Sequence, residues 1–119
     1  MLKVLLVCQK ESNEMLKSLL KNSLETVEFI DEEMVDNNCI IIKEIDDNID
    51  GISNLANYQG LVFMVSDGKY MFELLEYKPL AFIRKDHLQE DIDFIRGQLE
   101  YFKQGLESYI DFKSSYQTV

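Results

Sequence analysis

The chain contains the stretch CIIIK at residues 39–43, a short apolar run rich in β-branched side chains. Apolar side chains at consecutive positions indicate a strand that is buried on both faces, which is typical of parallel sheets. A similar run begins the chain at residues 2–8, and a third, LVFMVS, occupies residues 61–66. Shorter strands are predicted at residues 26–30 and 80–85. The sequence therefore supplies five strands to one sheet.

Helical patterns alternate with these strands. Apolar residues recur at helical spacing after Ser12, which we interpret as the N-cap of the first helix. Residues 31–38 and 52–58 have room for only a turn or two of helix, and residues 69–77 form a further helical segment. Strands that alternate with helices favour right-handed crossovers and a parallel sheet covered on both sides.

The last helix has the most regular pattern in the chain. Asp86 is predicted to be its N-cap, with Gln89 three residues later completing a capping box. Apolar residues then form a seven-residue repeat on one helix face, namely Leu88, Ile92, Ile95, Leu99, Phe102 and Leu106. A helix over residues 87–107 is about 30 Å long, whereas a strand of five or six residues spans about 20 Å. We therefore expect its last turns to project past the sheet.

The projecting turns are expected to bind a second copy of the chain. Their apolar stripe, formed by Leu99, Phe102 and Leu106, needs a partner, so a homodimer through this helix is predicted. Gly97 and Gly105 are poor helix formers. Either they permit close approach of a second helix, or Gly105 ends the helix as its C-cap.

Composition narrows the class of protein. A chain of 119 residues with 46% hydrophobic and 29% charged residues is an ordinary globule with room for one domain. Its net charge of −10, from 22 acidic and 12 basic residues, repels a phosphate backbone and argues against direct nucleic-acid binding. No apolar run approaches the roughly 18 residues that cross a bilayer. Two cysteines inside apolar runs favour reduced thiols in a cytoplasmic protein.

The stretch YKPLAFIRKDHLQEDI, at residues 77–92, resembles the end of the receiver domain in response regulators of the LytTR (AgrA-like) class. With the strands at residues 39–43 and 61–66 in order upstream, the resemblance covers nearly the whole chain. It implies a flavodoxin-like (CheY-like), doubly wound α/β fold with a five-stranded parallel sheet, shortened second and third helices and a long C-terminal helix. Residues 1–107 would form the receiver-like domain. Residues 108–119 alternate like a strand, and would be a linker or the start of a C-terminal DNA-binding output domain.

The resemblance also assigns the phosphorylation site of a receiver, and several positions depart from the family pattern. The acidic pair that holds magnesium falls on Gln9 and Lys10, and the phosphoacceptor aspartate falls on Glu44. The hydroxyl residue that closes the fourth strand falls on Val65 or Ser66. These departures put phosphorylation in doubt.

Two other positions of the receiver site are retained. Lys85 matches the lysine at the end of the fifth strand, and Phe82 matches the aromatic switch residue in that strand. Magnesium needs several hard oxygen ligands, which an amide and an ammonium do not supply. We therefore expect no metal, no cofactor and no enzymatic activity. Glu44 is instead expected to form an ion pair with Lys10 and Lys85.

The predicted function is that of a degenerate receiver, or pseudo-receiver. It would be the regulatory and dimerisation module of a signal-responsive transcription regulator in two-component signalling, without the usual magnesium-dependent phosphorylation. One alternative is a phosphocysteine protein similar to sugar phosphotransferase IIB, with Cys8 as nucleophile. Its loop QKES lacks the glycines that such a phosphate loop needs, and Glu11 would repel phosphate. The other alternative is a free-standing protein-interaction module.

Overall fold

The computed structural model describes the backbone of residues 2–24 and 26–117, and the side chains of residues 2–24 and 26–102. Its elements follow the chain in the order β1 (Leu2–Val7), α1 (Lys10–Ser23), β2 (Val27–Phe29), η1 (Glu32–Met34), β3 (Ile40–Glu44), η2 (Ile52–Leu55), β4 (Leu61–Val65), α2 (Met71–Leu75), β5 (Ala81–Arg84), η3 (Lys85–His87) and α3 (Leu88–Gln117). The η elements are single turns of 3-10 helix.

The five strands form one parallel sheet in the order β2-β1-β3-β4-β5. This is the flavodoxin-like order, in which the chain reverses direction across the sheet between β1 and β3. The predicted fold class is therefore confirmed. The strand β3, predicted from the run CIIIK, lies at the centre of the sheet and pairs with both β1 and β4.

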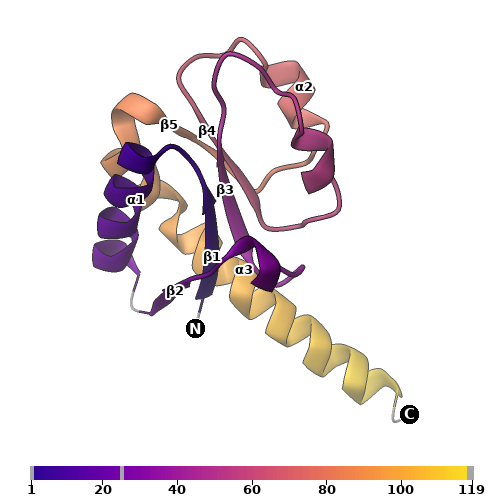
Figure 1. Cartoon of the computed structure of the whole chain (residues 1–119). Coiled ribbons are helices and arrows are strands. Elements are labelled where there is room, and N and C mark those ends of the chain that lie inside the picture. The colour runs from indigo at the N-terminus through magenta and orange to yellow at the C-terminus, as the bar shows by residue number, and fades with distance from the viewer. Residues whose placement is uncertain (1, 25, 118–119) are drawn as a thin grey trace.

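Two apolar cores lie on opposite faces of the sheet. On one face, α1 and α3 pack against the sheet through buried residues such as Leu16, Leu20, Ile92 and Ile95. On the other face, the short elements η2 and α2 lie over residues such as Phe63. Figure 1 shows α1 and α3 on one side of the strands and α2 on the other. Successive side chains of each strand point to opposite faces of the sheet, so each strand contributes to both cores.

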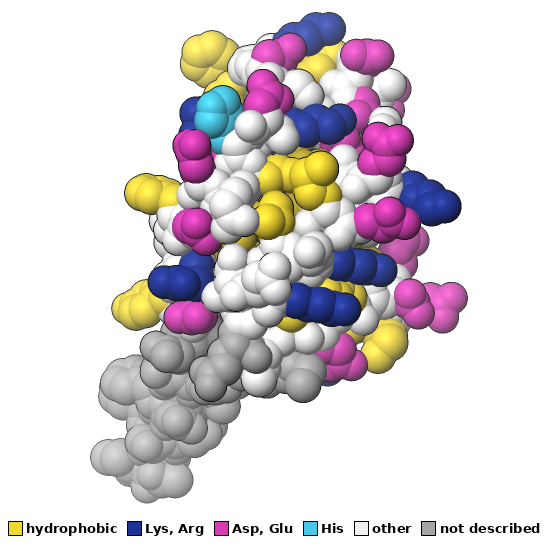
Figure 2. Space-filling model, turned by 90° about the vertical axis from the view of Figure 1, so that its left-hand side faces the viewer, with side chains coloured by type: hydrophobic (Ala, Val, Ile, Leu, Met, Phe, Trp, Pro, Cys, Tyr) yellow, Lys and Arg dark blue, Asp and Glu magenta, His cyan; other side chains and the backbone are white. Residues whose placement is uncertain are grey.

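The surface on the side of α1 carries charged side chains of both signs around an apolar area (Figure 2). In the part of the chain that is described, no helix is both long and apolar enough to span a bilayer.

The predicted starts of two helices were wrong. The helix α1 begins at Lys10, so Ser12 is not an N-cap but lies in the first turn, with its side chain buried. Asp86 lies inside η3 and not at the N-cap of α3. The carboxylate of Asp91 holds this corner, because it accepts hydrogen bonds from the backbone N–H and the guanidinium of Arg84 at 2.7, 3.0 and 2.9 Å.

The helix α3 is longer than the residues 87–107 that were predicted. Its backbone runs through Gln117 and past the amino-terminal edge of the sheet (Figure 1). The strand expected within residues 108–119 is therefore wrong up to residue 117, and Gly105 is not the C-cap. Adding a residue to an existing helix gains one hydrogen bond without a new nucleation cost, which favours continuation over a weak strand pattern.

The expected dimer stripe is largely part of the chain's own core. Leu99 is 1% exposed and packs within the core under α1 and α3, where half-buried Phe102 also packs. The side chain of Leu106 lies outside the described residues. Leu99 therefore has no free surface to offer a second copy.

Candidate functional site

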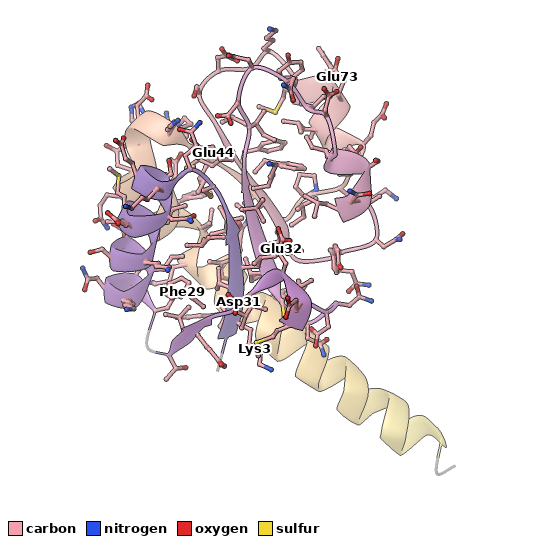
Figure 3. All side chains as sticks on the ribbon, viewed as in Figure 1. Lys3, Phe29, Asp31, Glu32, Glu44 and Glu73 are labelled. Atoms are coloured by element: carbon pink, nitrogen blue, oxygen red, sulfur yellow. The ribbon has the colours of Figure 1, made fainter. Side chains whose placement is uncertain are left out.

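The carboxyl edge of the sheet brings together residues from three separate strand ends. Glu44 is the last residue of β3, and Lys85 directly follows β5. Gln9 lies between β1 and α1. Because parallel strands end at the same edge, residues remote in sequence meet there. Figure 3 shows Glu44 at this edge, beside the first turn of α1.

Glu44 is buried and has several partners. Its side chain is 2% exposed, and its Oε2 lies 2.5 Å from the Nζ of Lys85. Its Oε1 accepts a 2.8 Å hydrogen bond from the backbone N–H of Gln9, and its Oε2 accepts one of 3.2 Å from the hydroxyl of Ser12. The carboxylate therefore neutralises a lysine and also satisfies donors at the start of α1, where negative charge is favoured by the helix dipole.

These contacts change the ionisation of both partners. Burial alone would raise the pKa of Glu44, but the hydrogen bonds from Lys85, Gln9 and Ser12 outweigh it, and the pKa is lowered. The hydrogen bond to Glu44 raises the pKa of Lys85, whose side chain is 38% exposed. Glu44 and Lys85 are therefore both charged at neutral pH.

The ion pair was predicted with two lysines, and the structure forms it with one. Lys10 is the first residue of α1 and is exposed. Among the described residues its ammonium lies in no ion pair, whereas Lys85 takes the position beside the carboxylate. A residue at the start of α1 projects outward here, because the inward face of this helix is occupied by Ser12, Leu16 and Leu20.

Ser12 was predicted to be an N-cap, but it belongs to this site. The signal for its position was present, since Ser12, Leu16 and Leu20 are spaced by four and share one helix face. A serine on the buried face of a helix needs a hydrogen-bond partner. Glu44 supplies that partner.

A pocket of about 510 Å³ opens beside the ion pair. Both candidates for the hydroxyl position line it: Val65 ends β4 and is buried, and exposed Ser66 follows. Only Ser66 carries a hydroxyl. The loops after β3 and β4 are joined across the pocket by the hydroxyl of Tyr70, which donates to the backbone carbonyl of Asp47.

The aromatic residue Phe82 lies on β5, away from the pocket lining. It is half-buried, and its ring centroid is 5.9 Å from that of Phe63 in the core on the η2 and α2 face. Its present packing is therefore that of a core residue.

The pocket edge carries carboxylates, but they do not form a metal centre. Asp46 and Asp47 follow Glu44 and are exposed, and the amide of Gln9 lies 3.4 Å from Asp46. Among the described residues, no group of three or more His, Cys, Asp or Glu side chains could hold a metal ion. The carboxylate of Glu44 is already engaged by Lys85.

Cys8 lies close to the same edge, with its thiol 3.5 Å from the backbone carbonyl of Ile42. Burial, followed by the negative charge of Glu44, raises the pKa of Cys8 to about 12. Since the thiolate is the nucleophile, a thiol that stays protonated at neutral pH is poorly suited to attack. This environment argues against the phosphocysteine alternative.

Comparison with known proteins adds no assignment to this geometry. No family model matches the sequence, and no curated protein matches it significantly. Function is therefore inferred from the fold, from the residues at the carboxyl edge of the sheet and from the sequence resemblance.

Proposed function

We propose that this chain is a receiver-like regulatory domain in which a fixed charge replaces the phosphorylated aspartate. The observation that carries the proposal is the buried carboxylate of Glu44 at the end of the central strand, 2.5 Å from the ammonium of Lys85. The resemblance to LytTR-class receivers assigns the acceptor and the lysine to these same two residues. The proposal includes a place in a cytoplasmic, signal-responsive transcription regulator.

The proposal excludes magnesium-dependent phosphorylation because Glu44 is not free to take part in it. Its oxygens are held by Lys85, Gln9 and Ser12. A magnesium ion would have to displace a lysine and recruit further oxygen ligands. The neighbouring position, Lys10, adds a positive charge that disfavours a cation.

The ion pair supports a structural role in regulation. Lys85 begins η3, which leads directly into α3. The pair therefore ties the central strand to the turn that sets where α3 starts. In this proposal, the fixed pair keeps α3, and any output domain attached to it, in one arrangement.

Incubation with acetyl phosphate and magnesium, followed by intact-mass measurement, tests the proposal. The unmodified mass is expected for this chain, and a phosphorylated product is expected for an active receiver treated in parallel. A phosphoryl group on the wild-type chain would contradict the proposal.

We also propose a second copy of the chain as a partner, but through a different part of α3. Phe94 and Tyr101 are 82% and 73% exposed and are seven residues apart, so they share one helix face. Light scattering of a Phe94→Glu, Tyr101→Glu variant tests this surface without touching the core. A dimeric mass that the variant retains would rule it out.

A further inference from the structure

The shortened connections before and after β3 leave a hollow on one face of the sheet. In place of long helices, only the single turns η1 and η2 lie there. A pocket of about 400 Å³ opens between them, with Leu5, Val7, Ile41 and Lys43 from β1 and β3, and Leu55 and Tyr58 from the η2 side. It shares no lining residue with the pocket at the carboxyl edge.

Lys43 is the unusual residue in this pocket. It lies in the central strand of a parallel sheet, in register with Val7 on one side and Phe63 on the other. Strands in that position are normally apolar throughout. Its side chain is half-buried, and within the described part of the chain it forms no ion pair and no hydrogen bond.

Among the described residues, no carboxylate lies within ion-pair distance of the Lys43 ammonium, so its charge is available to a ligand. An anion placed in the pocket would form a charge-assisted contact with this ammonium. The volume, and a lining in which apolar side chains outnumber the charged ones, are typical of a small-molecule site. Lys43 would set the orientation of such a ligand.

The rim of the pocket limits the charge of the ligand. Glu32, from η1, and Asp50, before η2, both line it and are exposed. Figure 3 shows Glu32 on η1, in front of the sheet. These two negative charges would repel a doubly charged phosphate about twice as strongly as a single carboxylate, so a ligand that pairs with Lys43 is expected to carry only one negative charge.

We propose that this pocket binds a small monocarboxylate with a flat apolar body, whose carboxylate pairs with Lys43. The apolar body would lie against Val7, Leu55 and Tyr58. This inference does not depend on the proposed receiver-like function, because the two pockets have no lining residue in common.

The test compares 2-naphthoate with its uncharged analogue 2-naphthamide by ¹⁵N-resolved NMR titration of the full chain. Saturable shifts are expected at the amides of Lys43, Leu55 and Tyr58, with the acid bound about tenfold more tightly than the amide, as expected for one charge-assisted contact. Equal affinities, or shifts that map elsewhere, would overturn the proposal. So would the absence of saturable binding of the acid.

Variants then assign the preference to one side chain. Lys43→Gln should remove the acid preference, and Lys43→Arg, which keeps the charge, should retain it. Leu55→Trp should weaken both probes by filling the pocket. The matched control is Lys3→Gln, because Lys3 lies on the same sheet face in β1 but is exposed and outside the pocket lining.

The variants separate a binding role from ordinary packing. If Lys43 only covers apolar surface with its methylene stem, Lys43→Gln should change the affinities for the acid and for the amide equally. An acid preference that survives in Lys43→Gln would therefore overturn the proposal. If a variant does not fold, the comparison of acid with amide on the wild-type chain still tests the proposal.

Discussion

Replacing Lys85 with methionine removes the cation from the buried ion pair while keeping the length of an apolar side chain. Glu44 then retains its hydrogen bonds from Gln9 and Ser12 but loses the charge 2.5 Å from its Oε2. In the wild type the Glu44 side chain is only 2% exposed. The variant therefore leaves a charge that water reaches poorly.

The expected cost lies between two limits. Removing one partner of a fully buried pair costs about 3–5 kcal/mol, and an exposed pair contributes about 0–1 kcal/mol. Because Lys85 is 38% exposed, its charge is screened in part by solvent. We expect Lys85→Met to lower the free energy of unfolding by about 2 kcal/mol at neutral pH, a large share of the roughly 5–15 kcal/mol of a typical domain.

The effect should depend on pH with a definite sign. In the wild type the pKa of Glu44 is lowered, so its stabilisation is present above the ordinary glutamate pKa and is lost as the pH falls through the lowered value. Without Lys85, we expect burial to raise the pKa of Glu44 above its wild-type value. Protonation then relieves the buried charge in the variant first, so the difference between variant and wild type should shrink as the pH falls from the variant's raised pKa toward the wild type's lowered one.

Urea denaturation at pH 7 and pH 4 measures both quantities. Lys10→Met is the matched control, because Lys10 is an exposed lysine with no ion pair among the described residues, and its removal should change stability by less than about 0.5 kcal/mol. Adding Glu44→Gln to Lys85→Met should recover part of the loss. Equal stability of Lys85→Met and Lys10→Met at pH 7 would refute the reasoning.

Two further measurements check the packing and the chemistry of the chain. A Cβ added at Gly60 would lie 2.2 Å from the backbone oxygen of Cys39, so Gly60→Ala should lower the melting temperature. A Cβ added at Gly97, on an exposed helix face, would meet nothing within 4 Å. Gly97→Ala should therefore raise the free energy of unfolding by about 1 kcal/mol. Because the pKa of Cys8 is raised to about 12, iodoacetamide should modify the folded chain at Cys8 far more slowly at pH 7.5 than the chain unfolded in urea, and equal rates would contradict its burial.

The strands were predictable because burial on both faces leaves a simple pattern. The apolar runs at residues 2–8, 39–43 and 61–66 each match a strand of the sheet, and the strand ends agree within a residue or two. The short second and third connections were also predictable, because the chain has too few residues there for full helices. The parallel sheet followed from the alternation of strands with helices, whereas the flavodoxin-like arrangement was expected from the resemblance to receivers.

The details that failed depend on contacts between distant residues. Ser12 has the local pattern of an N-cap, but Glu44, from another strand, accepts its hydroxyl hydrogen bond. Lys10 and Lys85 were equivalent partners for Glu44 in sequence, and the helix face decided between them. Leu99 was predicted to lie on a free helix face, because the sequence alone does not show how far the sheet and α1 extend along α3.

The arrangement of α1 and α3 has a consequence for synthesis of the chain. Leu16 and Leu20 are buried in a core that is completed by Ile92, Ile95 and Leu99 at the other end of the chain. On a ribosome that adds about 5–20 residues per second, the apolar face of α1 waits through roughly eighty further residues, on the order of several seconds, for its cover to emerge. Until then it is open to chaperones and to aggregation, so the nascent chain is most vulnerable before its last helix is made.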